Sequence, residues 1–254
     1  MQATFLGLVQ GLTEWLPISS SGHLALLQIL AGMEVPVAFD VLLHSGTLLS
    51  VCVYFRRELG RILNALAKVD TGSGDFRMAL LIAVGTIPAA AAGLLLRGFF
   101  ESLFTSLAAI GAGFLVTAAM LAVARLGRGG KSEIDLRIAV ISGFFQAAAI
   151  APGISRSGMT ISSSLIAGAD KGSAFRFSFL LSIPAILGAL IVELPSLQLS
   201  QFGWEYLMGF ITSAAAGFAS IGAVRRAVLS ERFPAFSIYC ALAGFATLAL
   251  ALYG

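Results

Sequence analysis

Two stretches of the sequence repeat each other: Gly7-Leu-Val-Gln10 with Ile18-Ser-Ser-Ser-Gly22, and Gly143-Phe-Phe-Gln146 with Ile154-Ser-Arg-Ser-Gly158. The offset is 136 residues without a gap, and ten of the positions from 7 to 47 are identical to their counterparts. Glu34 opposite Asp170 adds a conservative match. A shift of about half the length indicates a duplicated unit, which we place at about residues 1–127 and 137–254. Both copies place a Ser-rich turn between short apolar segments, which in a membrane protein indicates a binding site.

The composition is that of a membrane protein. Charged residues make up 11% of the chain and apolar residues 58%, whereas a soluble domain has roughly 25% charged residues. The mean hydropathy is +0.94, and no cleavable signal peptide is apparent. Cys52 and Cys240 lie inside apolar segments, which argues against a disulfide framework, and no zinc-like ligand spacing exists. A membrane span needs about 20 apolar residues, and we predict six spans, at 41–56, 78–97, 104–125, 176–194, 205–224 and 236–253.

Two further pairs of apolar segments are too short to cross a membrane singly. They are 2–16 with 23–33, broken at Pro17 to Gly22, and 137–151 with 159–169, broken at Pro152 to Gly158. Short segments around such a break predict re-entrant helical hairpins, which enter and leave on one side. The alternative is that each pair forms one kinked span.

The basic residues predict the orientation. Fourteen of the sixteen Lys and Arg fall in loops on one side of the six spans. Only Arg97 falls near the opposite side, and Arg156 lies in the second serine turn. The positive-inside rule therefore places the basic loops, including Arg128 and Lys131, in the cytoplasm and both termini outside. The Arg56-Arg57 and Arg225-Arg226 pairs are orientation signals that can also contact acidic membrane lipids, not nucleic-acid sites.

Each repeat holds one hairpin and three spans, and because three is odd the second repeat is inverted relative to the first. The sequence therefore predicts an all-α polytopic membrane protein with an inverted-topology repeat, six transmembrane helices and two re-entrant hairpins. The two hairpins enter from opposite sides, so their serine turns can meet near the midplane. Non-helical backbone is tolerated at that depth only inside protein or beside a wet cavity.

The first turn carries candidate catalytic residues. Gln10 and Glu14 are four residues apart, so they share one face of a helix that leads into the turn. A charge at membrane depth costs about 2.5–3.5 kcal/mol, which favours a functional role for Glu14, although a structural ion pair is the alternative. His23 follows the serines Ser19, Ser20 and Ser21, and its imidazole suits general acid or base chemistry.

The second turn predicts an anion site. A new helix begins after the turn, and its free N–H groups favour a negative ligand. Arg156 adds a planar guanidinium that matches phosphate oxygens. Further donors are the hydroxyls of Ser155, Ser157 and Thr160 and the backbone near Gly158, although ordinary N-capping also explains the hydroxyls.

These motifs carry a resemblance. Glu-x-Leu-Pro-x-Ser-Ser-x-Gly-His (Glu14 to His23) and Pro-Gly-x-Ser-Arg-Ser-Gly-x-Thr (Pro152 to Thr160) resemble the two signature motifs of the bacitracin-resistance type undecaprenyl-pyrophosphate phosphatases. The similarity extends over essentially the whole chain, including Gly85-Thr-Ile-Pro88. The family's first motif has Glu or Gln, then three residues, then Glu; this chain has the Gln version, which weakens any metal site that needs two carboxylates there.

The resemblance implies an integral enzyme of the bacterial plasma membrane, which hydrolyses a polyprenyl pyrophosphate to the monophosphate and so recycles the lipid carrier for cell-wall synthesis. We expect Arg156, the Ser155 and Ser157 region and the following helix N-terminus to hold the terminal phosphoryl group. A serine of the first turn, by preference Ser20, would attack phosphorus, with Glu14 and His23 available for proton transfer and Gln10 for orientation. Direct attack by water is the alternative. The resemblance also implies dependence on a divalent cation, Mg²⁺ or Ca²⁺, for which the sequence offers no dedicated ligand cluster.

A flippase or transporter of polyprenyl phosphate, with or without hydrolysis, is the rival interpretation, because inverted repeats with broken helices are a transporter architecture. For His44, in the first span, we favour hydrogen bonding between helices over a place in the cavity. The Ala/Gly-rich segments 105–119 and 209–223 permit the close helix approach of a homodimer, although packing within the chain explains them equally well.

Overall fold

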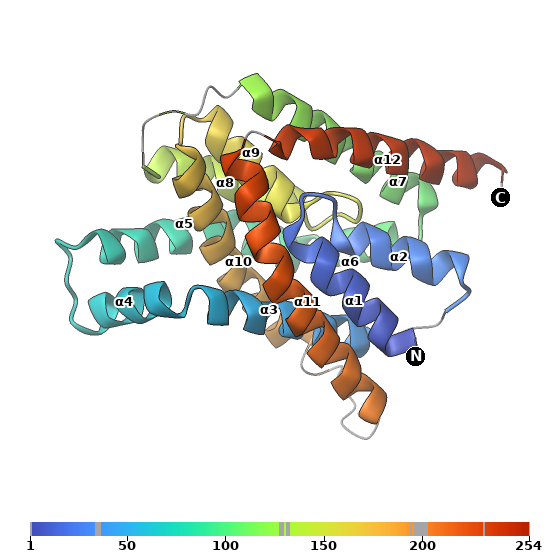
Figure 1. The fold of residues 1–254 in the computed structure, drawn as a ribbon, viewed down its shortest axis with the longest axis horizontal. Helices are drawn as coiled ribbons and strands as arrows, with labels where there is room; N and C mark the ends of the chain where they lie inside the picture. The colour runs from blue at the N-terminus through green and yellow to red at the C-terminus, as the bar shows by residue number, and fades with distance from the viewer. Residues whose placement is uncertain are drawn as a thin grey trace.

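The structure is a computed structural model that describes residues 2–33, 37–126, 130, 133–193, 195, 203–230 and 232–253. Within these ranges every regular element is helical (Figure 1). Glu34, Arg128 and Lys131, which entered the repeat and charge arguments, lie outside the described residues.

The two Ser-rich turns each separate a pair of short helices. The first pair is α1 (Gln2–Trp15) and α2 (Ser20–Leu30), and the second is α8 (Leu136–Ala148) and α9 (Arg156–Ile166). Each second helix begins where a serine hydroxyl accepts a hydrogen bond from a backbone N–H three residues ahead, an N-cap that satisfies one free donor. Both bonds, from Gly22 N to Ser19 Oγ and from Gly158 N to Ser155 Oγ, measure 3.2 Å.

Four of the six predicted spans coincide with segments that are long and apolar enough to cross a membrane. They are α5 (Gly74–Leu95), α10 (Lys171–Glu193), α11 (Trp204–Leu229) and the segment Phe233–Tyr253, which comprises the short 3-10 turn η4 (Phe233–Ala235) and α12 (Phe236–Tyr253). Proline lies inside α5 and α10, at Pro88 and Pro184.

The other two predicted spans are not confirmed. For the span 41–56, the apolar part of α3 (Val37–Tyr54) is a helix of Phe39–Tyr54 that is short for a span. For 104–125, α7 (Leu107–Val123) follows α6 (Arg97–Leu103) at a bend of 97°, so this pair counts at most as one broken span. By length and composition the described residues therefore support four spans, or five with the bent pair. The apolar window continued through Phe104 and Thr105, but the chain turns there and α7 starts with Ser106 as its N-cap.

The helix α4 (Arg56–Ala67) was not predicted, because its mixed polar and apolar residues belong to no span. It follows α3 directly. Elsewhere in the chain, a short 3-10 turn, η1 (Ala124–Leu126), follows the end of α7. Ion pairs join α4 to two other helices: Arg61 lies 3.3 Å from Asp75 of α5, and Arg176 of α10 pairs with Glu58. These contacts hold together the end of the molecule where the basic residues lie.

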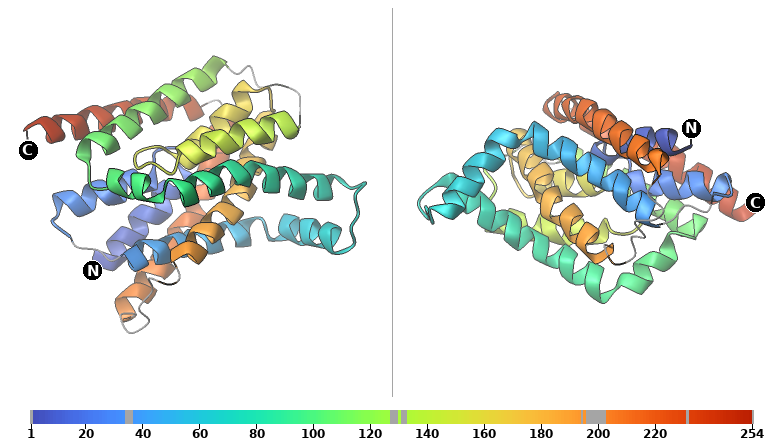
Figure 2. Two further views of the ribbon diagram at one scale, coloured as in Figure 1. Left: turned by 180° about the vertical axis from the view of Figure 1, so that it is seen from behind. Right: turned by 90° about the horizontal axis from the view of Figure 1, so that it is seen from below.

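The two halves of the chain are packed into each other. In the first half α1 packs on α11 of the second, and α8 of the second half packs on α5 of the first. Helices in equivalent positions also pair with each other, α3 with α10 and α7 with α12 (Figures 1 and 2). Glycine permits the closest approaches: a Cβ on Gly7 would lie 2.4 Å from the Gly209 carbonyl oxygen, and one on Gly143 would lie 2.6 Å from that of Gly85.

The two Ser-rich turns meet inside this packing. A Cβ on Gly22 would lie 2.8 Å from the Cα of Gly153, so the two backbones are in contact. Ser157 Oγ donates a 3.2 Å hydrogen bond across the same contact to the carbonyl oxygen of Leu16. The sequence prediction that the two turns lie together is therefore confirmed in the described residues.

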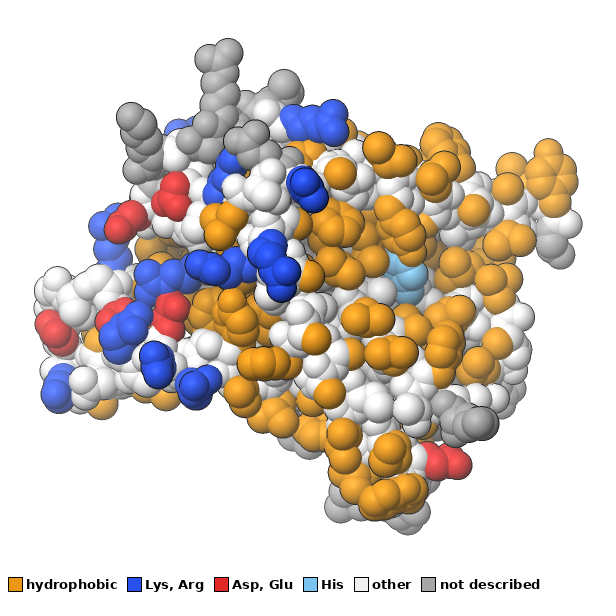
Figure 3. Space-filling view, in the orientation of Figure 1, with side chains coloured by type: hydrophobic (Ala, Val, Ile, Leu, Met, Phe, Trp, Pro, Cys, Tyr) orange, Lys and Arg blue, Asp and Glu red, His pale blue; other side chains and the backbone are white. Residues whose placement is uncertain are grey.

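The surface is divided between charged and apolar regions. Figure 3 shows Lys and Arg side chains gathered on one half of the visible face and hydrophobic side chains over most of the remainder. Both chain ends lie toward the half that has few basic residues (Figures 1 and 3). Large side chains such as Leu95 and Leu242 are 82% and 66% exposed, as expected for helices that face lipid.

Candidate active site

A cavity of about 490 Å³ opens beside the first serine turn. Helices α3, α5, α6, α8 and α10 form its walls, and most of the residues along it are apolar. Its polar residues gather where the two turns meet, and a second polar group, Arg97, Glu101 and Glu193, lies where α6 approaches the end of α10. The arrangement suits a molecule with a polar head and an apolar tail.

Glu14 is the centre of the polar end. It lies on α1, is 8% exposed and accepts hydrogen bonds from both turns. Ser20 Oγ donates to Glu14 Oε2 at 2.5 Å, and Arg156 Nη2 donates to Oε1 at 2.6 Å. Gln10 Nε2 donates to Oε2 at 3.1 Å, because the two residues are one helical turn apart. The ion pair that the sequence left as an alternative is thus present, between Glu14 and Arg156. The same carboxylate also accepts a hydrogen bond from the Ser20 hydroxyl.

Arg156 is oriented from both sides. Its guanidinium carbon lies 5.1 Å from the ring centroid of Trp15, which is fully buried and stacks on Phe179. A cation over an indole ring is attractive, so Trp15 supports the face of the guanidinium while Glu14 binds one edge. A second nitrogen of the guanidinium, Nη1, is buried and has no hydrogen-bond partner.

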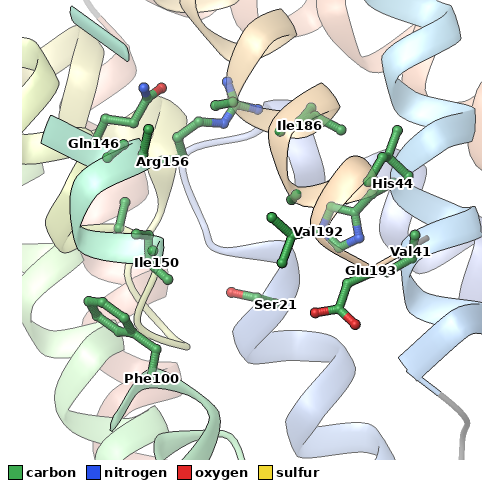
Figure 4. A pocket seen from close by; sticks show the side chains of 18 of the residues that line it. Ser21, Val41, His44, Phe100, Gln146, Ile150, Arg156, Ile186, Val192 and Glu193 are labelled. Carbon is green, nitrogen blue, oxygen red and sulfur yellow. The ribbon is translucent and has the colours of Figure 1, made fainter. Parts of the chain in front are cut away.

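Further polar atoms at this end lack partners. Both side-chain atoms of Gln146 and Oε1 of Gln10 are buried and unpaired. Gln146 lines the cavity with Arg156, and Figure 4 shows the two side chains at the same end of it. Buried polar groups normally have partners. Unpaired donors that line a cavity therefore indicate where a polar ligand binds.

The structure brings six of the eleven predicted site residues to the cavity wall: Glu14, Ser19, Ser20, Ser21, Ser155 and Arg156. The other five, Gln10, His23, Ser157, Gly158 and Thr160, do not line it. Gln10 reaches the cavity only through Glu14, and Thr160 Oγ1 bonds to Ser178 Oγ at 2.6 Å on α10. The roles of all eleven stay predictions.

The sequence predicted His23 in the site and His44 between helices, and the structure shows the reverse arrangement. His23 Nε2 lies 2.6 Å from the Tyr239 hydroxyl and its ring stacks on Tyr239 of α12. The side chain thus faces α12 and not Glu14. His44, for which we favoured a contact between helices, lines the cavity with Nε2 3.7 Å from Glu14 Oε2. A single sequence carries no signal for this exchange, because both histidines stand beside serines in apolar segments.

A family model described as bacitracin resistance protein BacA matches residues 3–246 of this chain. The chain belongs to the bacitracin resistance protein BacA family. The resemblance drawn from the two motifs is therefore confirmed for the chain as a whole, and both serine turns lie inside the matched region.

Proteins named undecaprenyl-diphosphatase are similar to this BacA family member over nearly their full lengths. The one from Korarchaeum cryptofilum (strain OPF8) is 43% identical over 260 residues, which cover 98% of each chain. That from Methanosphaera stadtmanae is 36% identical over 99% of this chain and 98% of its own. That from Carboxydothermus hydrogenoformans is 39% identical over 100% and 98%. These names describe a hydrolase and do not support the rival interpretation of a flippase.

The described residues of this BacA family member do not fit a protein-held cation. They contain no group of three or more His, Cys, Asp or Glu side chains placed to bind one. Both oxygens of Glu14 are already bonded, to Arg156 and to Ser20 with Gln10.

Proposed function

We propose that this protein hydrolyses undecaprenyl or a related polyprenyl diphosphate to the monophosphate and inorganic phosphate. It would thereby recycle the lipid carrier of cell-wall synthesis and confer resistance to bacitracin. The observation that carries the proposal is the cluster of Ser20, Glu14 and Arg156 at the polar end of a mainly apolar cavity, with Arg156 Nη1 unpaired. The family membership and the names of the relatives agree with it.

In this proposal the polar end of the cavity performs phosphoryl transfer. Arg156 Nη1 and the N-terminus of α9 bind the terminal phosphate, since transfer of a phosphoryl group depends mainly on positioning and charge stabilisation. Ser20 attacks phosphorus while its proton passes to Glu14, which already accepts that hydroxyl at 2.5 Å. The alternative is a water molecule that attacks in place of Ser20. The apolar walls hold the prenyl chain.

The proposed architecture is a pair of inverted halves, about 1–127 and 137–254. Its support is reciprocal contact between equivalent positions. Gly22 approaches Gly153, and Gly158, the counterpart of Gly22, approaches Pro17, the counterpart of Gly153. The carbonyls of the counterparts Gly153 and Pro17 also each accept a hydrogen bond from the opposite half, from Thr117 of α7 and from Cys240 of α12. Such exchange of partners is what a pseudo-two-fold axis produces.

The remaining expectations follow from this arrangement. The positive-inside rule places the basic end in the cytoplasm and both termini outside, in the plasma membrane. The cavity then opens near Arg97 on the outer side, where the outer leaflet supplies the lipid. A divalent cation would enter with the diphosphate, whose oxygens supply most of its ligands. A homodimer stays a prediction. The glycines at 111, 209, 217 and 244 pack against helices of the same chain, so their small size is already explained without a partner.

The test is phosphate release from polyprenyl diphosphate by the purified full-length protein in detergent, where there is no bilayer to cross. We expect Arg156→Ala to lower kcat/KM by about 10²–10³-fold, as removal of one donor to a developing charge does. Arg57→Ala is the matched control, because Arg57 is exposed on α4 outside the cavity. Undiminished hydrolysis by Arg156→Ala would contradict the proposal. Acid-quench trapping of phosphoserine in the native protein, and its loss in Ser20→Ala, separates attack by serine from attack by water.

A further inference from the structure

We propose that His44 is the proton-relay residue of this site, accepting through Glu14 the proton that the attacking hydroxyl loses. The inference rests on the proposed phosphatase function and adds a residue that lies outside both signature motifs. It also moves the acid–base role from His23, the histidine of the first motif, to a histidine on α3.

The hydrogen bonds of His44 leave one nitrogen for chemistry. Its Nδ1 lies 2.8 Å from the carbonyl oxygen of Asp40, one helical turn earlier. Because a carbonyl oxygen can only accept, Nδ1 carries the proton in the neutral ring and Nε2 has the free lone pair. Nε2 points into the cavity, 3.7 Å from Glu14 Oε2, and the side chain is 31% exposed there. Figure 4 shows the ring projecting from α3 into this space.

His23 shows why the same local geometry has a different result. Its Nδ1 also bonds to the carbonyl oxygen four residues earlier, that of Ser19, at 2.7 Å. Its Nε2, however, is bonded to the Tyr239 hydroxyl. The ring lies between Tyr239 and Phe114, away from the cavity wall. Both nitrogens of His23 therefore have protein partners, whereas Nε2 of His44 faces Glu14 and the cavity.

A contact between helices, which the sequence favoured for His44, does not account for this placement. Among the described residues no hydrogen bond joins Nε2 to a neighbouring helix. The charged group that lies close to Nε2 is the Glu14 carboxylate. A role in packing alone would not explain why Nε2 faces Glu14 and the cavity.

The charges around His44 come from several helices. Those that line the cavity with it are Glu14 of α1, Asp40 of its own helix, Arg97 and Glu101 of α6, Arg156 of α9 and Glu193 of α10. The Asp40 carboxylate is engaged by Gln28 Nε2 at 3.0 Å, and Arg97 bonds to both Glu101 and Glu193. The charged residues of α11, which also packs on α3, are near its ends, at Glu205, Arg225 and Arg226. Among these groups the Glu14 carboxylate has an oxygen 3.7 Å from Nε2.

The relay balances over both halves of the reaction. In the first half the Oγ–P bond of Ser20 forms, the P–O bond to the lipid monophosphate breaks, and the Oγ proton passes through Glu14 Oε2 to His44 Nε2. The imidazolium then releases this proton to water at the cavity mouth. In the second half a water oxygen bonds to phosphorus, the Oγ–P bond breaks, and one water proton passes through Glu14 to Ser20 Oγ. The net products are lipid monophosphate, inorganic phosphate and one proton.

The experiment is the pH dependence of phosphate release in detergent for the native protein, His44→Gln and His23→Gln. An Nε2 that already carries a proton cannot accept another, so the native kcat/KM should fall toward acid pH. We expect His44→Gln to lower kcat by about 10²-fold and to abolish that acid limb. His23→Gln makes the same substitution at the histidine that faces Tyr239, and its profile should retain the limb even if its rate is lower.

The results distinguish failure of the relay from failure of the proposed phosphatase function. If the native protein releases no phosphate, the phosphatase proposal fails; if it does and His44→Gln keeps the native pH profile, only the relay fails. If His44→Gln is too slow to profile, imidazole added to His44→Ala decides. Restoration of activity supports the relay, and its absence in a variant with the native thermal midpoint overturns it.

Discussion

Glu14 receives three hydrogen bonds at the polar end, from Gln10 on its own helix, from Ser20 in one turn and from Arg156 in the other. A carboxylate in that position keeps the two turns together before any ligand binds. It also uses only one edge of the guanidinium. The opposite nitrogen and the neighbouring Gln146 remain for an anion, at the cost of unpaired polar groups in the free protein.

At the scale of single residues we predict that Gln146→Leu stabilises the fold of the protein but weakens its binding of lipid diphosphate. The substitution removes two unpaired polar atoms without a large change of volume, so the thermal midpoint should rise. It also removes a ligand contact beside Arg156, so KM for lipid diphosphate should rise about 10-fold, which corresponds to a loss of about 1.4 kcal/mol of binding.

Ser162→Ala is the matched control for Gln146→Leu. The Ser162 hydroxyl is likewise buried and unpaired, but it does not line the cavity. Its removal should leave KM unchanged. An unchanged KM in Gln146→Leu, measured together with this control, would show that the amide contacts no substrate.

How far the sequence predicted the site depended on whether a residue belonged to one of the two signature motifs. Glu14, Ser20 and Arg156 were predicted because the two motifs stand at equivalent positions and the turns had to meet. His44 and Gln146 were not assigned, because their place in the cavity depends on which face α3 and α8 present after packing. The place of Trp15 against the face of the Arg156 guanidinium likewise depends on packing. Rotations of packed helices are tertiary information that a single sequence does not contain.

Among the helices, α7 holds the second turn in place. Thr117 Oγ1 donates to the carbonyl oxygen of Gly153 and accepts from Ser155 N, each at 2.9 Å. A Cβ on Gly113 would lie 2.2 Å from the Pro152 carbonyl oxygen. The turn that carries Arg156 is therefore seated directly on the backbone of α7. The bend before α7, which shortens the predicted span at its start, belongs to this arrangement.

At the scale of elements we predict that Gly113→Ala displaces the second turn. A methyl group has no room at that position, and overpacking costs about 1–3 kcal/mol. The thermal midpoint in detergent should fall, and phosphate release should fall further than stability alone explains, because Arg156 moves away from Glu14. Gly222→Ala on α11 is the control, since nothing lies within 4 Å of its added Cβ. Equal behaviour of the two variants would show that α7 does not position the turn.

For the whole molecule, the separation of basic and apolar surface decides how the cavity is reached. If the basic end faces the cytoplasm, Arg97, Glu101 and Glu193 lie at the outer side, and the cavity beside them draws lipid from the outer leaflet. We predict that Thr105→Cys, exposed between α6 and α7, reacts with a membrane-impermeant maleimide in intact cells. Thr71→Cys, exposed in the turn after α4, should react only after lysis. The reverse pattern would place the cavity mouth on the cytoplasmic side, where lipid diphosphate of the outer leaflet could not enter without first being moved across the membrane.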